Sequence, residues 1–564
     1  MNMADSSHKK GRYTKYSNKI GLHSNSKGGF IKNDTDVVLS FPFKDTVLEA
    51  GMSKEDVGRE ERFLHIEVDR KDIDTLEEPK VLTDFKLVDK NGEKQLTADD
   101  DIEFFDEEGK LKRSLLIKGN NLLALHTLTS RLAGQVKLIY IDPPYNTGGD
   151  GFKYNDKFNH SAWLAFMKNR LEVAKELLRD DGSIFIQCDD NEQAYLRVLM
   201  DEIYGRDNFY TTIVWRKRTT APNDRPIGRM HEYIHIASKN MEKLELYLQP
   251  RSEESKARYQ NPDNDPRGAW VAADLSANGK GNRMVASLVF PITNPATGQS
   301  SMPGDGKCWL YNKEKISKYL EEGRIGFREK SGRPFLKRYL SEVRDGVTLP
   351  TILNDAGFSS NSSQEMKKLF DDDRFEYPKP EKLMQTLIQS ATQKGDIILD
   401  FCLGSGTTSA VAHKMGRYWI GIEQMDYIEN VAMERMKKVV TGDAVGISED
   451  VNWSGGGSFV YFEMKKYNQE YVDRITQATS LSELEDIYVE MRNNAFLKFW
   501  FDRKEFEKDE NFRNLDIEKR KQKLIDVLDE NQLYLNYADM NDTRHKVNED
   551  EKVLTDKFYG TAEN

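Results

Sequence analysis

The sequence predicts an α/β protein whose core is a doubly wound, mostly parallel sheet. Three apolar runs, residues 136–141, 396–401 and 418–422, have the length and composition of buried strands. The second run leads through a glycine-rich turn into an apolar helical segment at 409–415. Sheets of this kind hold nucleotide-like ligands at such turns, because glycines let the backbone approach closely. We therefore expect a binding site at the carboxyl ends of these strands.

A stiff tetrapeptide, Asp142-Pro143-Pro144-Tyr145, follows the first strand. The Asp142 carboxylate and the Pro143 carbonyl can both accept hydrogen bonds from an exocyclic amino group. Each proline fixes its own φ and lacks an N–H, so the segment presents acceptors without donors. Tyr145 offers a ring face for stacking. The four letters alone would also fit an ordinary proline turn, since short motifs match by chance.

The turn after the second strand contains the residues expected to bind a cofactor, namely Phe401, Gly404, Ser405, Gly406, Thr407 and Thr408. Glu423 ends the third strand about 20 residues after Gly404, the spacing at which a carboxylate holds ribose hydroxyls. Serine at position 409 replaces the third glycine of the dinucleotide pattern, and no Gly-Lys-Ser/Thr follows. Neither a dinucleotide site nor an ATP phosphate loop is therefore predicted.

Together the two motifs resemble the β group of DNA amino-methyltransferases. In that family an Asp/Asn/Ser-Pro-Pro-Tyr/Phe motif precedes a Phe-x-Gly-x-Gly cofactor turn, which here has one extra residue. The resemblance implies a circularly permuted Rossmann-like methyltransferase sheet and S-adenosyl-L-methionine as cofactor. It also implies that Lys379 and Pro380 line the cofactor pocket. Asn120 and Asn121 could touch the cofactor's adenine, and helix capping is the alternative for each.

Segments outside these motifs, at 37–49, 71–82 and 453–463, are similar to the modification subunits of type III restriction systems. This resemblance implies an enzyme that methylates N6 of adenine in double-stranded DNA, because aspartate at the first motif position favours adenine in the family. It also implies a separate restriction subunit that carries ATPase and nuclease motifs. We further expect a homodimer.

Changes in composition divide the chain into six expected regions. They are a disordered N-terminal tail (1–35), an N-terminal docking or packing region (36–111), the catalytic half of the methyltransferase domain (112–237), an inserted target-recognition domain (238–375), the cofactor-binding half (376–445) and a mostly helical C-terminal assembly region (446–564).

Two groups of cations are expected to contact DNA phosphates. One lies at 216–229 beside a tryptophan, where a solvated loop is the alternative, and the other lies at 324–344 among aromatic residues. The chain has a net charge of -11, so DNA must be met by such local basic surface. The residues expected to bind DNA are Arg216, Lys217, Arg218, Arg225 and Arg229 in the first group, and Arg333, Lys337 and Arg338 in the second.

Residues 231–235, His-Glu-Tyr-Ile-His, formally match a zinc-protease motif. That motif requires a helix that places both histidines on one face, together with a third ligand. The segment is short and rich in β-formers, so a strand is predicted and no metal is expected.

The three cysteines are far apart in the sequence, which excludes a disulfide scaffold and fits a cytoplasmic protein. The polar start of the chain predicts no signal peptide. No apolar stretch approaches the roughly 18 residues that cross a bilayer, so no membrane partner is expected.

Other functions stay open at this point. The chain could be a solitary DNA methyltransferase without a nuclease partner, since no helicase or nuclease motif is recognisable in it. It could act on N4 of cytosine, because the chemistry permits either amino group. A catalytically silent DNA-binding subunit is disfavoured by the intact motifs. An RNA or protein methyltransferase is disfavoured by the large insertion between the two halves.

Overall fold

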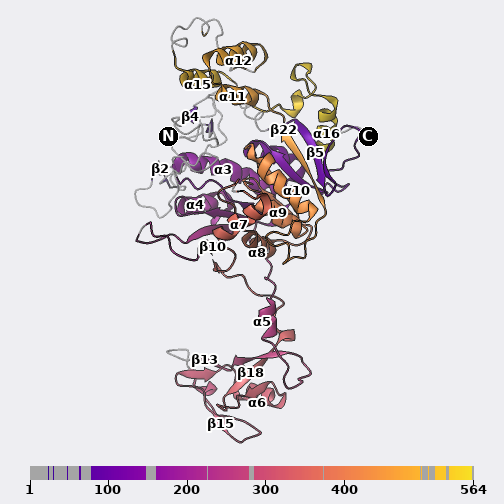
Figure 1. The fold of residues 1–564 in the computed structure, drawn as a ribbon. Coiled ribbons are helices and arrows are strands. Elements are labelled where there is room, and N and C mark those ends of the chain that lie inside the picture. Colours follow the sequence, from indigo (N-terminus) through magenta and orange to yellow (C-terminus); the bar gives the residue numbers. More distant parts are fainter. Residues whose placement is uncertain are drawn as a thin grey trace. The chain divides into compact units, whose positions relative to one another are not determined.

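The computed structural model describes residues 78–147, 160–224, 226–278, 285–372, 374–495, 515–528 and 533–561, together with a few isolated positions. Among the latter are four short strands, β1 (His23–Ser24), β2 (Gly29–Phe30), β3 (Val47–Leu48) and β4 (Phe63–Leu64). Most of the tail expected at 1–35 therefore lies outside the described residues. The chain forms two compact units, one of Met1–Tyr247 with Pro350–Asn564 and one of Leu248–Leu349 (Figure 1).

The larger unit is built around one sheet, to which the described residues contribute eleven strands. In spatial order these are β19 (Ile352–Leu353), β10 (Phe209–Arg216), β11 (His231–Ser238), β9 (Leu178–Cys188), β8 (Val136–Ile141), β20 (Ile397–Asp400), β21 (Tyr418–Glu423), β7 (Ser114–Lys118), β22 (Ser458–Met464), β5 (Leu82–Asp89) and β6 (Gly92–Gln95).

The six neighbouring strands from β9 to β22 are parallel to one another. β11 is antiparallel to β9 and β10, and on the other side β5 is antiparallel to β22 and β6. The prediction of a doubly wound, mostly parallel sheet is confirmed. The three strands predicted at 136–141, 396–401 and 418–422 all lie in the parallel part.

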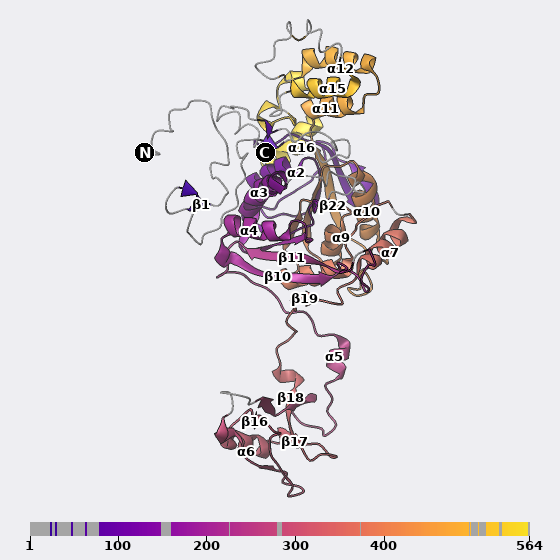
Figure 2. The ribbon, with the colours of Figure 1, turned by 90° about the vertical axis from the view of Figure 1, so that its left-hand side faces the viewer.

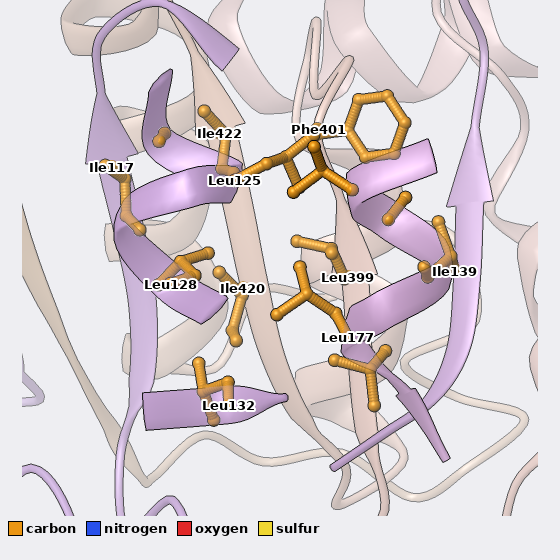
Figure 3. Close-up of a cluster of buried hydrophobic side chains, with 14 of the residues drawn as sticks. Ile117, Leu125, Leu128, Leu132, Ile139, Leu177, Leu399, Phe401, Ile420 and Ile422 are labelled. Carbon is orange, nitrogen blue, oxygen red and sulfur yellow. The ribbon is translucent and has the colours of Figure 1, made fainter. Parts of the chain in front are cut away.

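Successive side chains of a strand point to opposite sides, so the apolar strands of this sheet present two apolar faces. Helices cover both of them. On one face Ile139, Leu399 and Ile420 pack with α2 (Asn121–Leu132) and α3 (His160–Leu177), as Figure 3 shows. On the other face Trp419 donates a hydrogen bond of 3.1 Å to His413 of α9 (Thr407–Lys414). Figure 2 shows α4 (Gln193–Tyr204) beside β10 and β11.

Further helices complete the larger unit. They are α7 (Ser359–Phe370), α8 (Glu381–Ala391), the π-helical segment η7 (Ile428–Met433), α10 (Glu434–Thr441), α11 (Asn468–Gln477), α12 (Leu481–Asn494), α15 (Ile517–Asp526) and α16 (Glu549–Tyr559). Ile475, Leu484 and Leu524 join α11, α12 and α15 in a separate cluster. Among the described helices, none is long and apolar enough to cross a membrane.

β22 corrects the expected limits of the sheet. Sequence reasoning assigned 446–564 to assembly, yet β22 lies inside the sheet between β7 and β5, and its Val460 and Phe462 are buried. β5 in turn comes from the region expected to serve docking or packing. Residues 459–462 are apolar on both faces of the strand, and a strand of this kind is stable only in the interior of a sheet that is covered on both sides.

The smaller unit has its own core, formed by Leu275, Ile292, Trp309, Ile316 and Ile325. It is narrower than the target-recognition domain expected at 238–375, because β19 and α7 belong to the larger unit. Its elements are α5 (Glu253–Ala257), β12 (Trp270–Asp274), β13 (Ser276–Asn278), β14 (Ile292–Thr293), β15 (Ser300–Ser301), β16 (Lys307–Trp309), α6 (Lys313–Glu321), β17 (Ile325–Phe327) and β18 (Pro334–Tyr339). β12, β18 and β17 form an antiparallel sheet.

Candidate active site

The order of strands brings the two sequence motifs together. β8 lies beside β20, and β20 lies beside β21, so the tetrapeptide, the glycine-rich turn and Glu423 meet at one edge of the parallel sheet. They line a cleft that encloses about 1130 Å³, part of it open to solvent. The predicted site residues that line it are Asn121, Asp142, Pro143, Pro144, Tyr145, Lys217, Lys379, Phe401, Gly404, Ser405, Thr407, Thr408 and Glu423.

Asp142 is held by two neighbours in this cleft. Its Oδ1 accepts a hydrogen bond of 2.5 Å from the Tyr145 hydroxyl, and its Oδ2 accepts one from the Lys379 ammonium. Burial raises the pKa of Asp142 above its usual range, and Lys379 opposes that rise. The tetrapeptide itself is tied to α3, because the Trp163 indole donates to the Pro144 carbonyl at 2.6 Å. Lys379, expected at the cofactor, thus pairs with the acid of the tetrapeptide.

Glu232 is a cleft residue that sequence reasoning missed. The strand predicted for 231–235 is confirmed as part of β11, and Glu232 lines the cleft from it. Its Oε2 accepts a hydrogen bond from Gln187 at 2.6 Å, and its Oε1 accepts one from Lys217 at 2.8 Å. The Tyr145 hydroxyl lies 3.1 Å from Oε2. An acid in a strand predicted to be buried was the signal that could have identified it.

The positive charges around Glu232 keep it ionised. Burial would raise the pKa of this carboxyl group, but Lys379 and Lys217 hold it below the usual range. His235 of the same strand is buried, and its ring nitrogens lie within hydrogen-bond distance of Thr212 and Gln193. Burial lowers the pKa of His235 to about 4, so the ring is neutral and structural at ordinary pH.

The cofactor turn has the backbone that a close approach requires. Gly404 and Gly406 are in the left-handed region, with φ of +55° and +77°. A Cβ atom on Gly404 would lie 3.2 Å from the Phe375 ring, which also lines the cleft. Gly406 is the N-cap of α9 and itself lies outside the lining. A glycine cradle beside aromatic faces fits a nucleoside-like cofactor such as S-adenosyl-L-methionine.

Glu423 is fixed by four protein donors. Its Oε2 accepts from the Gly404 N–H at 3.0 Å and from the Tyr427 hydroxyl at 2.9 Å. Its Oε1 accepts from the N–H groups of Gln424 and Met425 at 3.0 and 3.1 Å. A carboxylate offers about four acceptor sites, so a ribose hydroxyl would have to displace one of these donors, most readily that of Tyr427.

The two asparagines differ in what they do. Asn120 caps α2, because its side chain accepts from the Leu122 N–H at 3.0 Å, which is the alternative that the sequence left open. Asn121 lines the cleft and donates to the Phe401 carbonyl at 2.8 Å. Its Oδ1 accepts from Arg170 at 2.6 Å, so Asn121 links α2 and α3 to the cofactor turn.

A buried ionic network lies behind the turn. Glu381 accepts hydrogen bonds from Lys414 and from Arg435, each at 2.9 Å, and all three side chains are almost wholly buried. Arg435 also donates to Thr407 Oγ1 at 2.7 Å. The network therefore holds the first residue of α9 in place. Pro380, which sequence reasoning assigned to the pocket, instead precedes α8 as its N-cap.

The described cations of the first group of predicted DNA contacts lie in different surroundings, one in the cleft and the others outside it. Lys217 lies in the cleft on Glu232, whereas Arg216 donates to the Thr219 carbonyl at 2.6 Å near the surface. Arg229 is 3.3 Å from Asp190. Arg218 is exposed, and Arg225 lies outside the described residues.

The second group belongs to the smaller unit. Arg333 and Arg338 are exposed there. Lys337 is neutralised by Asp263 and by Asp265, the latter at 3.1 Å, and its ammonium lies 5.3 Å from the Trp270 ring centroid. Lys337 is therefore less available to a phosphate than the two arginines.

The mostly parallel sheet, the two acceptors Asp142 and Pro143, and the glycine-rich turn together define a Rossmann-like methyltransferase. Residues 136–434 match the family described as DNA methylase. The chain is 34% identical to the "Probable type III restriction-modification enzyme HindVI Mod subunit" of Haemophilus influenzae, over 97% of this chain and 88% of that protein. The chain belongs to the DNA methylase family and, within it, to the Mod subunits of type III restriction-modification enzymes.

Other relatives match over shorter parts. The EcoPI Mod subunit of Escherichia phage P1 is 32% identical over 57% of this chain and 58% of that protein. Among solved structures, the M1.HpyAVI–SAM complex is 15% identical over 57% of this chain and 98% of that chain, with a TM-score of 0.31.

Proposed function

We propose that this chain is the modification subunit of a type III restriction-modification system and methylates N6 of adenine in a base swung out of duplex DNA. One observation carries this proposal: the strand order places Asp142 and Pro143 beside the glycine turn, in a single cleft. An amino-group acceptor and a nucleoside cradle are thereby within reach of one another. Family membership supports S-adenosyl-L-methionine as the cofactor.

The chemistry follows from the acceptors. The lone pair of an adenine amino group is delocalised into the ring, so the nitrogen is a weak nucleophile. The Asp142 carboxylate and the Pro143 carbonyl can each accept one amino hydrogen and draw the nitrogen toward tetrahedral geometry. S-adenosyl-L-methionine, when bound, supplies a methyl group on a sulfonium. Asp142 then stabilises the positive charge that develops on the nitrogen, and alignment supplies much of the rate.

The base must leave the helix, which costs a few kcal/mol. Stacking on an aromatic ring such as Tyr145 would return about 1–3 kcal/mol of this cost. The proposed phosphate contacts are Arg216, which is partly buried, and the exposed Arg218, Arg333 and Arg338. We propose further that the enzyme is a homodimer, works with a restriction subunit and acts in the cytoplasm, where the free Cys188, Cys308 and Cys402 would stay reduced.

The test is to express the chain in cells that lack DNA methylation and to sequence modified bases in their DNA. N6-methyladenine at one short motif is expected, and it should be absent with Asp142→Ala. N4-methylcytosine would favour the cytosine alternative. No modified base, with the folded protein present, would contradict the proposal. Co-expression with a neighbouring gene that encodes ATPase and nuclease motifs would decide whether the subunit acts alone.

A further inference from the structure

Lys379 is hydrogen-bonded to Asp142, the carboxylate that the reaction needs as an acceptor. Its ammonium binds Oδ2 of Asp142, while the Tyr145 hydroxyl binds Oδ1 at 2.5 Å. The same ammonium lies 5.3 Å from the centroid of the Tyr145 ring and covers one of its faces. An incoming amino group would therefore share each carboxylate oxygen with a donor that is already bound there, and it would meet a cation beside the carboxylate.

A cation at this position also opposes the chemistry. Positive charge develops on the amino nitrogen as the methyl group arrives, and an ammonium on the same carboxylate repels it. Lys379 cannot simply lose its partner, because it lies within the cleft, where an unpaired ammonium is strongly disfavoured. The reaction thus requires a second anion within a short distance of Lys379.

Glu232 is that anion. Its Oε2 lies 4.0 Å from the Lys379 Nζ, so the flexible lysine side chain can turn away from Asp142 and bring its ammonium into a charge-assisted hydrogen bond with Glu232. Gln187 holds this oxygen in position at 2.6 Å, and Lys217 binds the other oxygen at 2.8 Å. The carboxylate is therefore ionised, oriented and ready to accept the lysine.

We propose that Glu232 is a positioning residue that receives Lys379 when the flipped base docks, so that Asp142 becomes free to grip the amino group. The inference rests on the proposed function, since it takes Asp142 as the acceptor of the amino group. It assigns a step before methyl transfer to a side chain that acts on the reaction through Lys379.

The experiment measures single-turnover methyl transfer to an unmethylated DNA duplex at saturating S-adenosyl-L-methionine. Glu232→Gln should lower the rate constant about ten- to a hundredfold, as loss of one hydrogen bond to a charged group implies. The affinity for the cofactor and for DNA should each change less than about twofold. An unchanged rate constant would overturn the proposal, and so would an equal loss of cofactor affinity.

A double-mutant cycle separates this role from a general structural one. Once Lys379→Met has removed the cation, Glu232 has nothing to receive. Glu232→Gln should then cost less than about threefold in that background. The same factor in both backgrounds would show that Glu232 acts independently of Lys379. Abolished transfer by Lys379→Met alone, at saturating cofactor, would show that the lysine has another essential role and would also overturn the proposal.

Two further variants guard against misfolding. Glu551→Gln is the matched control, because Glu551 is a poorly exposed carboxylate outside the cleft that pairs with Lys465 at a distance of 2.8 Å. The rate constant of this variant should equal that of the wild type. Glu232→Asp keeps the charge near Lys217 but withdraws it from Lys379. Its rate constant should fall between those of wild type and Glu232→Gln, and a wild-type value would contradict the proposal. If the wild type itself leaves adenine unmethylated, the proposed function fails instead.

Discussion

Replacing Glu381 with alanine should lower the free energy of unfolding of the larger unit by about 3–5 kcal/mol, the usual cost of breaking a buried ion pair. The carboxylate is fully buried and accepts from Lys414 and Arg435, each at 2.9 Å, and from the Ile447 N–H at 3.0 Å. Lys414 would keep Asp443 at 3.0 Å. Among the hydrogen bonds of the described residues, the Arg435 guanidinium would keep only neutral acceptors. Most of the lost stability therefore comes from leaving this buried charge without an anion.

The measurement is urea denaturation followed by tryptophan fluorescence, with the slope compared between variants to check that the unfolded state is alike. Asp450→Ala is the control, because Asp450 and its partner Lys382 are 50% and 49% exposed. An exposed pair contributes about 0–1 kcal/mol, so this variant should hardly change stability. A loss for Glu381→Ala no greater than that of the control would refute the reasoning.

Four further outcomes are expected. Asp142→Ala should abolish methyl transfer but leave cofactor affinity nearly unchanged by calorimetry; because burial raises the pKa of Asp142, the wild-type rate should fall as pH drops through a value above the usual aspartate range. Gly404→Val should weaken cofactor binding at least tenfold in the same titration, since φ is +55° there. The pKa of Glu365 is raised by burial from 4.5 to about 7, so the fold loses stability as pH rises through about 7, and Glu365→Gln should remove that loss in melts at pH 5 and 8. Arg338→Ala should reduce the salt slope of DNA binding by about 1, whereas Lys337→Ala, whose charge is already paired, should change it less.

The parallel core could be predicted because each of its strands carries its own signal. Residues 136–141 and 397–400 are mostly apolar, and both end at a motif that chemistry explains. Their meeting at one edge followed from the rule that ligands bind at the carboxyl ends of parallel strands. The local sequence pattern was sufficient to predict a strand and its site wherever the buried strand and the functional motif were adjacent in sequence.

Pairings across the chain could not be predicted. Nothing near Lys379 in sequence indicates Asp142 as its partner, and Glu232 was hidden in letters that matched an unrelated zinc motif. β22 was missed because its neighbours in the sheet, β7 and β5, come from residues 82–118, more than 300 positions earlier in the sequence. These contacts depend on tertiary proximity, which one sequence does not encode at short range.

The parallel pairing of β8 with β20 has a consequence for synthesis of the chain. β8 ends at Ile141 and β20 begins at Ile397, so the whole smaller unit is translated between two adjacent strands. During that interval β8 leaves the ribosome with one apolar edge unpaired, and such edges recruit other chains. Yield of native enzyme should therefore depend on chaperones that protect this edge during elongation, and a slower ribosome should prolong the hazard.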